Sequence, residues 1–280
     1  MREQVMLLGT ATRYAVAEHA RNRFAAVLIA VYLPVWTLLA YVSMPDRPVR
    51  LRLQATGELL VPRGNELTTV SGALNAVTLI TGFLMFAATF NGSLFDRRLV
   101  MAGYPRPHLI AAKLAGLALA SALVAAYATA VMFLAWAPRQ PALLAAALFS
   151  AGLTYGVLGV GFGALLRKEV EGMFAIVMTS VVDIALQNPI SSSSADSAIT
   201  HYLPSYGAMQ AATAAAFSGT SAPGYVLIEL IWFAAAAFLG LLTFQWRTRS
   251  ALPSTRLSTR RSRDLPCGGR CQKTDAPTAP

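Results

Sequence analysis

Residues 142–166 read ALLAAALFSAGLTYGVLGVGFGALL, a run of 25 residues without one charged side chain. A helix needs about 20 apolar residues to cross the hydrocarbon core of a bilayer, so the run predicts a complete membrane span. It also contains two glycine pairs spaced four apart, Gly152 with Gly156 and Gly159 with Gly163. Such pairs let helix backbones approach closely. We expect them to pack within one subunit, with a dimer interface as the alternative.

The whole chain shares this character, because 55% of its 280 residues are hydrophobic and only 13% are charged. About a quarter of the residues of an ordinary soluble domain are charged. Apolar runs predict five further spans, at 24–44, 71–90, 109–136, 172–187 and 225–246. The sequence therefore predicts an all-α, polytopic membrane protein, with six transmembrane helices in one domain at 25–248.

Three segments outside the spans have other characters. Residues 1–24 mix apolar positions with arginines and predict an amphipathic helix at the membrane interface. Residues 188–224 are uncharged except for Asp196 and are consistent with a partly inserted hairpin. Residues 249–280 are basic and rich in Ser, Gly and Pro, which predicts a disordered tail. Its Cys267 and Cys271 have no histidine nearby, so we interpret them as free thiols rather than a metal pair.

Basic residues set the expected orientation, because cytoplasmic segments retain Lys and Arg. With both termini cytoplasmic and six spans, 18 basic residues fall inside and five outside. A seventh span at 201–217 would place the tail outside, against this rule. The formal charge of +10 arises largely from the tail, where eight basic residues follow the last span. Such a cluster is typical of contact with anionic lipid, so we expect a cell-membrane protein that does not bind nucleic acid.

Residues for enzymatic chemistry are scarce. The three histidines are far apart in the chain: His19, His108 and His201. A phosphate-binding loop needs a Gly-Lys-Ser or Gly-Lys-Thr sequence, and none of the three lysines follows a glycine. We therefore expect no enzyme activity and no bound cofactor in this chain.

Residues 94–108 read LFDRRLVMAGYPRPH and connect the second and third spans. Asp96 is placed where a helix could begin, since an anion there complements the helix dipole. Gly103 and Pro105 predict the end of that helix and a turn. We expect a short helix that lies on the membrane face and docks into a partner. An ordinary charged loop is the alternative.

With this segment in place, the order of elements over residues 1–248 resembles that of the type-2 ABC exporter permeases. The resemblance implies an interfacial helix, six spans and an outer re-entrant helical hairpin between the last two. It also implies a second permease subunit, either an identical chain in a homodimer or a similar one, and a separate cytosolic ATPase that binds ATP and Mg. The expected cargo is drug-like, lipid-linked or polymeric. The positions that match the family's coupling region are Asp96, Arg97, Arg98, Gly103, Tyr104, Pro105 and Arg106. Many members have an acidic coupling segment, whereas this one is basic.

Two acidic residues fall within predicted spans, and intramembrane acids mark functional sites by default. Asp183 is near the outer end of the fifth span and Glu229 near the outer start of the sixth, at similar depth. They are candidates for the rim of a translocation pathway. The alternative is that Glu229 complements the helix dipole while Asp183 reaches interfacial water. An ion-coupled secondary transporter is the competing function, although the sequence shows no inverted repeat.

Overall fold

The computed structural model describes residues 9–10, 13–14, 23–54, 57–188, 190 and 198–249. Within these ranges, the side chains of residues 24, 93–97, 106–107 and 243–249 are not described. The predicted interfacial helix and the predicted tail therefore lie almost entirely outside the described residues.

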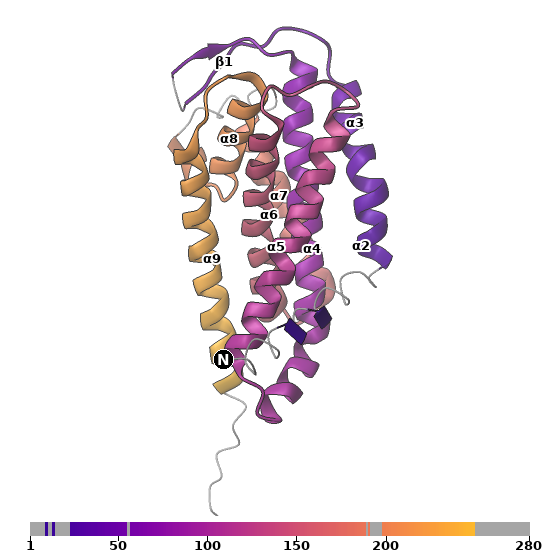
Figure 1. The fold of residues 1–280 in the computed structure, drawn as a ribbon, viewed down its shortest axis with the longest axis vertical. Coiled ribbons are helices and arrows are strands. Elements are labelled where there is room, and N and C mark those ends of the chain that lie inside the picture. The colour runs from indigo at the N-terminus through magenta and orange to yellow at the C-terminus, as the bar shows by residue number, and fades with distance from the viewer. Residues whose placement is uncertain are drawn as a thin grey trace, which may run out of the picture.

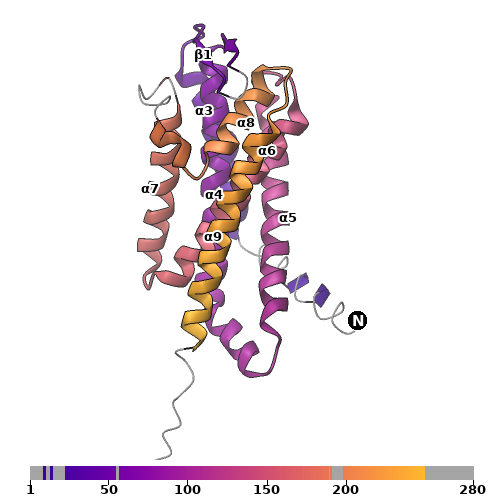
Figure 2. The same cartoon turned by 90° about the vertical axis from the view of Figure 1, so that its left-hand side faces the viewer.

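The described chain folds into an elongated bundle of helices (Figures 1 and 2). Its first half consists of α2 (Arg23–Val27), a π-helical turn η1 (Leu28–Tyr32), α3 (Leu33–Ser43), β1 (Leu51–Arg52), β2 (Leu59–Leu60), α4 (Gly64–Met101) and α5 (Arg106–Met132). Its second half consists of α6 (Pro141–Leu165), α7 (Glu169–Gln187), a 3-10 turn η2 (Ala198–Tyr202), α8 (Tyr206–Phe217) and α9 (Pro223–Arg249).

Five helical segments of the described chain are long and apolar enough to cross a membrane: Ala25–Ser43, Gly64–Gly92, His108–Met132, Pro141–Leu165 and Pro223–Leu242. They coincide with five of the six predicted spans, so the all-α, polytopic membrane fold is confirmed. The predicted fifth span corresponds to α7, which is helical over 19 residues but is not among these five. It contains three acidic residues, Glu169, Glu171 and Asp183.

The bundle is organised around α4 and α6, which pack along each other (Figure 1). A methyl group at Gly159 would lie 2.2 Å from the carbonyl oxygen of Gly82, and one at Gly163 would lie 3.0 Å from that of Phe86. A methyl group at Gly156 would lie 2.1 Å from Leu117 on α5. These glycines thus bring α6 against its neighbours in the same chain, which confirms the expectation of packing within one subunit.

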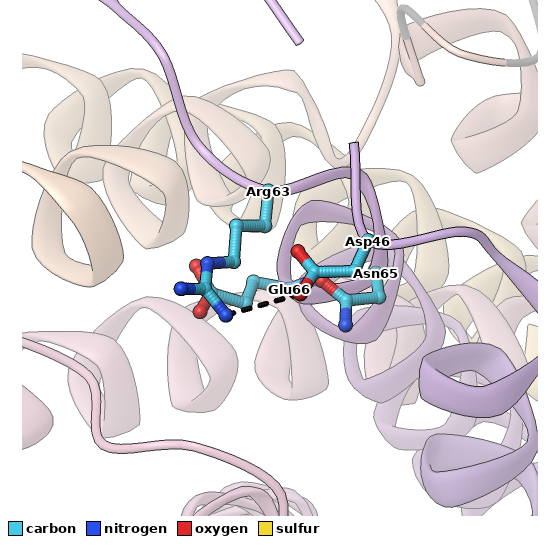
Figure 3. Close-up of polar contacts among 4 residues, drawn as sticks. All are labelled: Asp46, Arg63, Asn65 and Glu66. Carbon is cyan, nitrogen blue, oxygen red and sulfur yellow. Dashed lines mark hydrogen bonds and ion pairs between the residues drawn. The ribbon is translucent and has the colours of Figure 1, made fainter. Parts of the chain in front are cut away.

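One end of the bundle holds the α4–α5 turn at 102–105 and the α6–α7 connection at 166–168, and we call it the basic end (Figure 1). The opposite end holds the small antiparallel hairpin in which Leu51 pairs with Leu60. There α4 begins at Gly64 rather than at the predicted Ser71. Figure 3 shows Arg63, just before α4, paired with Asp46 at 3.2 Å. Both side chains are more than half exposed, so the pair adds little stability.

The close approach of α4 and α6 can be tested at Gly159. We expect Gly159→Ala to destabilise the protein by roughly 1–3 kcal/mol, because the added methyl group overlaps the backbone of Gly82. Thermal unfolding of the purified protein in detergent measures the change. Gly161→Ala is the control in the same helix, since nothing lies within 4 Å of the position its methyl group would take. Equal melting temperatures for the two variants would contradict this account of the packing.

Candidate functional site

Helix α8 lies inside the bundle at the end opposite the basic end, packed against α6 and α9 (Figures 1 and 2). Nearly all of its residues are buried, and six of its 12 residues are alanine. A helix this short cannot cross the bilayer. Its small side chains let it approach its neighbours closely: a methyl group at Gly207 would lie 2.3 Å from the carbonyl oxygen of Tyr225.

The N-terminus of α8 meets two buried carboxylates. The backbone N–H of Ser205 donates to Asp183 Oδ2 at 3.0 Å, and that of Ala208 donates to Glu229 Oε2 at 3.1 Å. The first N–H groups of a helix have no partner within the helix, and the positive end of its dipole favours an anion. Asp183 from α7 and Glu229 from α9 therefore hold the same helix end from two sides.

The C-terminal end of α8 is also hydrogen-bonded to the rest of the chain. The backbone N–H groups of Arg139 and Gln140, in the α5–α6 connection, donate to the carbonyl oxygens of Ala216 and Ala215 at 3.2 and 2.9 Å. The side chain of Gln140 donates to the carbonyl oxygen of Ser218 at 2.9 Å. Both ends of the buried helix are thus fixed by backbone hydrogen bonds.

Asp183 is the centre of a wider polar network. The hydroxyl of Tyr155 on α6 donates to its Oδ2 at 2.5 Å, and the side-chain amide of Gln187 donates to its Oδ1 at 2.5 Å. The Gln187 amide also donates to Ser205 Oγ at 3.0 Å. Asp183 is 1% exposed, so four donated hydrogen bonds within this group replace the water that its carboxylate and neighbours have lost.

A second polar contact joins α7 to α4 one turn away. Ser180 Oγ accepts from the side-chain amide of Asn75 at 3.0 Å and lies 2.7 Å from Thr78 Oγ1. Ser180, Asp183 and Gln187 follow helical spacing, so they form one inward polar stripe on α7. Five large apolar side chains of α7 are exposed on the outside of the bundle: Val170, Phe174, Met178, Val181 and Val182.

Glu229 is less completely paired than Asp183. It is 0% exposed, and its Oε1 has no hydrogen-bond partner among the described residues. Both acids are thus buried inside the bundle of this chain, and their expected role at the rim of a translocation pathway stays a prediction. Within the described ranges, no group of three or more His, Cys, Asp or Glu side chains could hold a metal ion.

The short helix predicted at the start of the coupling segment does not begin at Asp96, but the helix there ends where the sequence predicts. Helix α4 continues without interruption to Met101, so Asp96, Arg97 and Arg98 lie within its last turns and Asp96 does not begin a new helix. The preceding residues contain no proline, and the established helix continues through the predicted start because each added residue gains a backbone hydrogen bond.

The predicted stop is confirmed in detail. Gly103 has a positive φ of 87°, its N–H donates to the carbonyl oxygen of Val100 at 3.1 Å, and that of Tyr104 donates to Leu99 at 3.0 Å. This pair of bonds is a Schellman motif, which satisfies the last carbonyls of the helix. Pro105 then precedes Arg106, the first residue of α5. The seven residues of the segment thus lie together at the basic end (Figure 1).

Sequence reasoning singled out both acids but missed their partners. Ser180 and Gln187 could have been found, because they lie three residues before and four residues after Asp183 in one helix. Tyr155, Ser205 and Ala208 come from other helices, and no local pattern connects them with the acids.

No protein-family model matches the chain, and no curated protein matches it. What the chain does is therefore inferred from its residues and their geometry.

The role of Asp183 can be tested by an isosteric change. Asp183→Asn replaces an oxygen acceptor by an NH₂ group that faces donors, so we expect a loss of about 1–3 kcal/mol in stability. Thermal unfolding in detergent measures the loss. Glu169→Gln, at an exposed position in the first turn of the same helix, is the control and should change the melting temperature little. If both variants melt alike, Asp183 does not hold α8 as described.

Proposed function

We propose that the chain is the membrane permease subunit of an ATP-binding cassette exporter. In this proposal it forms a translocation pathway with a second copy of itself and is driven by a separate cytosolic ATPase that binds ATP and Mg. It lies in the cell membrane with both termini on the cytoplasmic side. The basic end of the bundle faces the cytoplasm, and α8 with η2 forms the outer re-entrant hairpin.

The observation that carries this proposal is the α4–α5 connection at the basic end. It ends the helix that packs against α3, α5, α6 and α7, so a force applied at Gly103 would reach the middle of the bundle. The Schellman motif makes the turn a defined structure rather than a loose loop. A partner that binds there would contact a turn of fixed geometry, which can transmit force to α4. We assign ATPase coupling to Asp96, Arg97, Arg98, Gly103, Tyr104, Pro105 and Arg106.

In the proposal α7 also crosses the membrane, as the fifth of six spans in chain order. Its 19 residues are about 28 Å long, close to the thickness of the hydrocarbon core of about 30 Å. Its outer face is apolar, and its polar stripe contacts α4, α6 and the start of α8. Six crossings also put both ends of the chain on one side, in agreement with the distribution of basic residues.

One observation favours a second candidate, an ion-coupled secondary transporter. Buried carboxylates inside membrane bundles mark ion and proton pathways, and Glu229 has an oxygen without a partner among the described residues. Transport assays separate the two functions. Cargo export that needs ATP and continues in the presence of a proton uncoupler supports the exporter. Export that stops with the uncoupler and ignores ATP supports the secondary carrier.

The coupling role can be tested with two glycines of positive φ at opposite ends of the bundle. Gly103→Val should reduce stimulation of the ATPase by the permease, because a β-branched residue strains this conformation by about 1–2 kcal/mol or more and displaces the turn. The measurement is ATP hydrolysis by the cytosolic ABC ATPase that co-purifies with the protein, with the permease reconstituted in vesicles.

Gly57→Val is the matched control, since Gly57 has a φ of 69° in the hairpin at the opposite end. It carries a similar strain and should leave stimulation unchanged. The exporter proposal fails if the ATPase does not bind the intact protein, or if Gly103→Val stimulates hydrolysis as well as Gly57→Val does.

A further inference from the structure

An apolar pocket lies between α5 and α9, with α4 and α6 behind it. Apolar residues from all four helices line it, among them Met85, Leu117, Val157, Ala164, Ala237 and Gly240. Figure 2 shows α5 and α9 as separate helices. The pocket is distinct from the polar network around Asp183, because none of the residues of that network lines it.

The pocket opens towards the membrane. Leu114, at its edge on α5, is 39% exposed, and Leu239 and Leu242 on α9 beside it are also exposed. In a protein that spans a bilayer, exposed apolar side chains of the spans face hydrocarbon. Gly240 forms part of the wall, and nothing lies within 4 Å of the position that a methyl group there would take. The open space is therefore continuous with the region of the acyl chains.

Two polar side chains line the pocket, Thr89 and Lys113. The hydroxyl of Thr89 is buried and has no hydrogen-bond partner among the described residues. By contrast, Thr81 and Thr129 donate to the carbonyl oxygen four residues earlier, at 2.7 and 2.9 Å. The oxygen of this hydroxyl is enclosed by protein atoms, so the polar contact that the pocket offers to an entering group comes from Lys113.

Lys113 supplies the charge. Among the described residues that line the pocket, it is the one with a charged side chain. It lies two turns into α5 from the basic end, which places its Cα about 10 Å from the start of the helix. A lysine at this depth extends its ammonium towards the interface, where anionic headgroups lie.

We propose that this pocket binds one acyl chain of an anionic phospholipid from the leaflet at the basic end, with the headgroup phosphate beside Lys113. The apolar walls accept the chain, and the Lys113 ammonium faces the phosphate oxygens. Charge complementarity at Lys113 and the opening towards the bilayer favour this occupant over a neutral hydrophobic molecule. The inference goes beyond the proposed function, because lipid binding requires neither the ATPase nor ATP.

Native mass spectrometry of the purified full chain tests the proposal. The protein is titrated with phosphatidylglycerol and, separately, with phosphatidylcholine of the same acyl chains, and the dissociation constant of the first bound lipid is obtained for each. We expect the first phosphatidylglycerol to bind the wild-type protein about tenfold more tightly than the first phosphatidylcholine, about 1.4 kcal/mol.

Two substitutions separate the chain pocket from the headgroup site. Gly240→Leu fills the pocket and should abolish the tight first phosphatidylglycerol site. Gly224→Leu, at the other end of the same helix, also projects into open space and should leave the site intact. Lys113→Gln should weaken phosphatidylglycerol binding about tenfold and leave phosphatidylcholine binding unchanged.

The proposal is overturned if Gly240→Leu binds phosphatidylglycerol as tightly as Gly224→Leu does, since the lipid would then be part of the general lipid shell. It is also overturned if Lys113→Gln keeps the preference for phosphatidylglycerol, since the occupant would then be neutral. Should Gly240→Leu lower the melting temperature, Ala237→Leu narrows the same pocket one turn away and decides in its place. Loss of ATPase coupling affects none of these outcomes.

Discussion

The N-terminus of α8 is buried, and its free backbone N–H groups must find acceptors where water is absent. Asp183 and Glu229 supply these acceptors from α7 and α9. Because each acid comes from a different helix, the two hydrogen bonds also fix where those helices stand around α8. The Tyr155 hydroxyl extends the same network to α6, which packs against α4, α5, α7, α8 and α9.

The network and the glycine contacts have complementary roles. Gly156, Gly159 and Gly163 bring α6 against α4 and α5 without any polar group, as is usual where helices pack in lipid. Helices α7 and α8 could not be held in this way alone, since α8 is short and α7 has a polar face. Specific hydrogen bonds therefore position α7 and α8, and close backbone packing positions α4, α5 and α6.

Apolar runs predicted the helices well, because length and charge depletion are local properties that the bilayer makes decisive. Gly103 and Pro105 also ended a helix as expected, since a positive φ and a missing N–H act at one position. The helix start at Asp96 was not predicted correctly, because a cap signal does not stop a helix that is already growing. The burial of Asp183 and Glu229 was not predictable from sequence, because it depends on the position of α8. The alanine-rich sequence of α8 has no distinct apolar face that would indicate which helices pack against it.

Helix α4 continues beyond its apolar segment, which ends at Gly92, as far as Met101. Its 38 residues make a rod about 57 Å long. If a helix of this length tilts by about 5° around its end at Gly64, the turn at Gly103 moves by about 5 Å. The helix would thus act as a lever, in which a rearrangement too small to disturb the packing around α8 becomes a displacement as large as one helical turn at the opposite end.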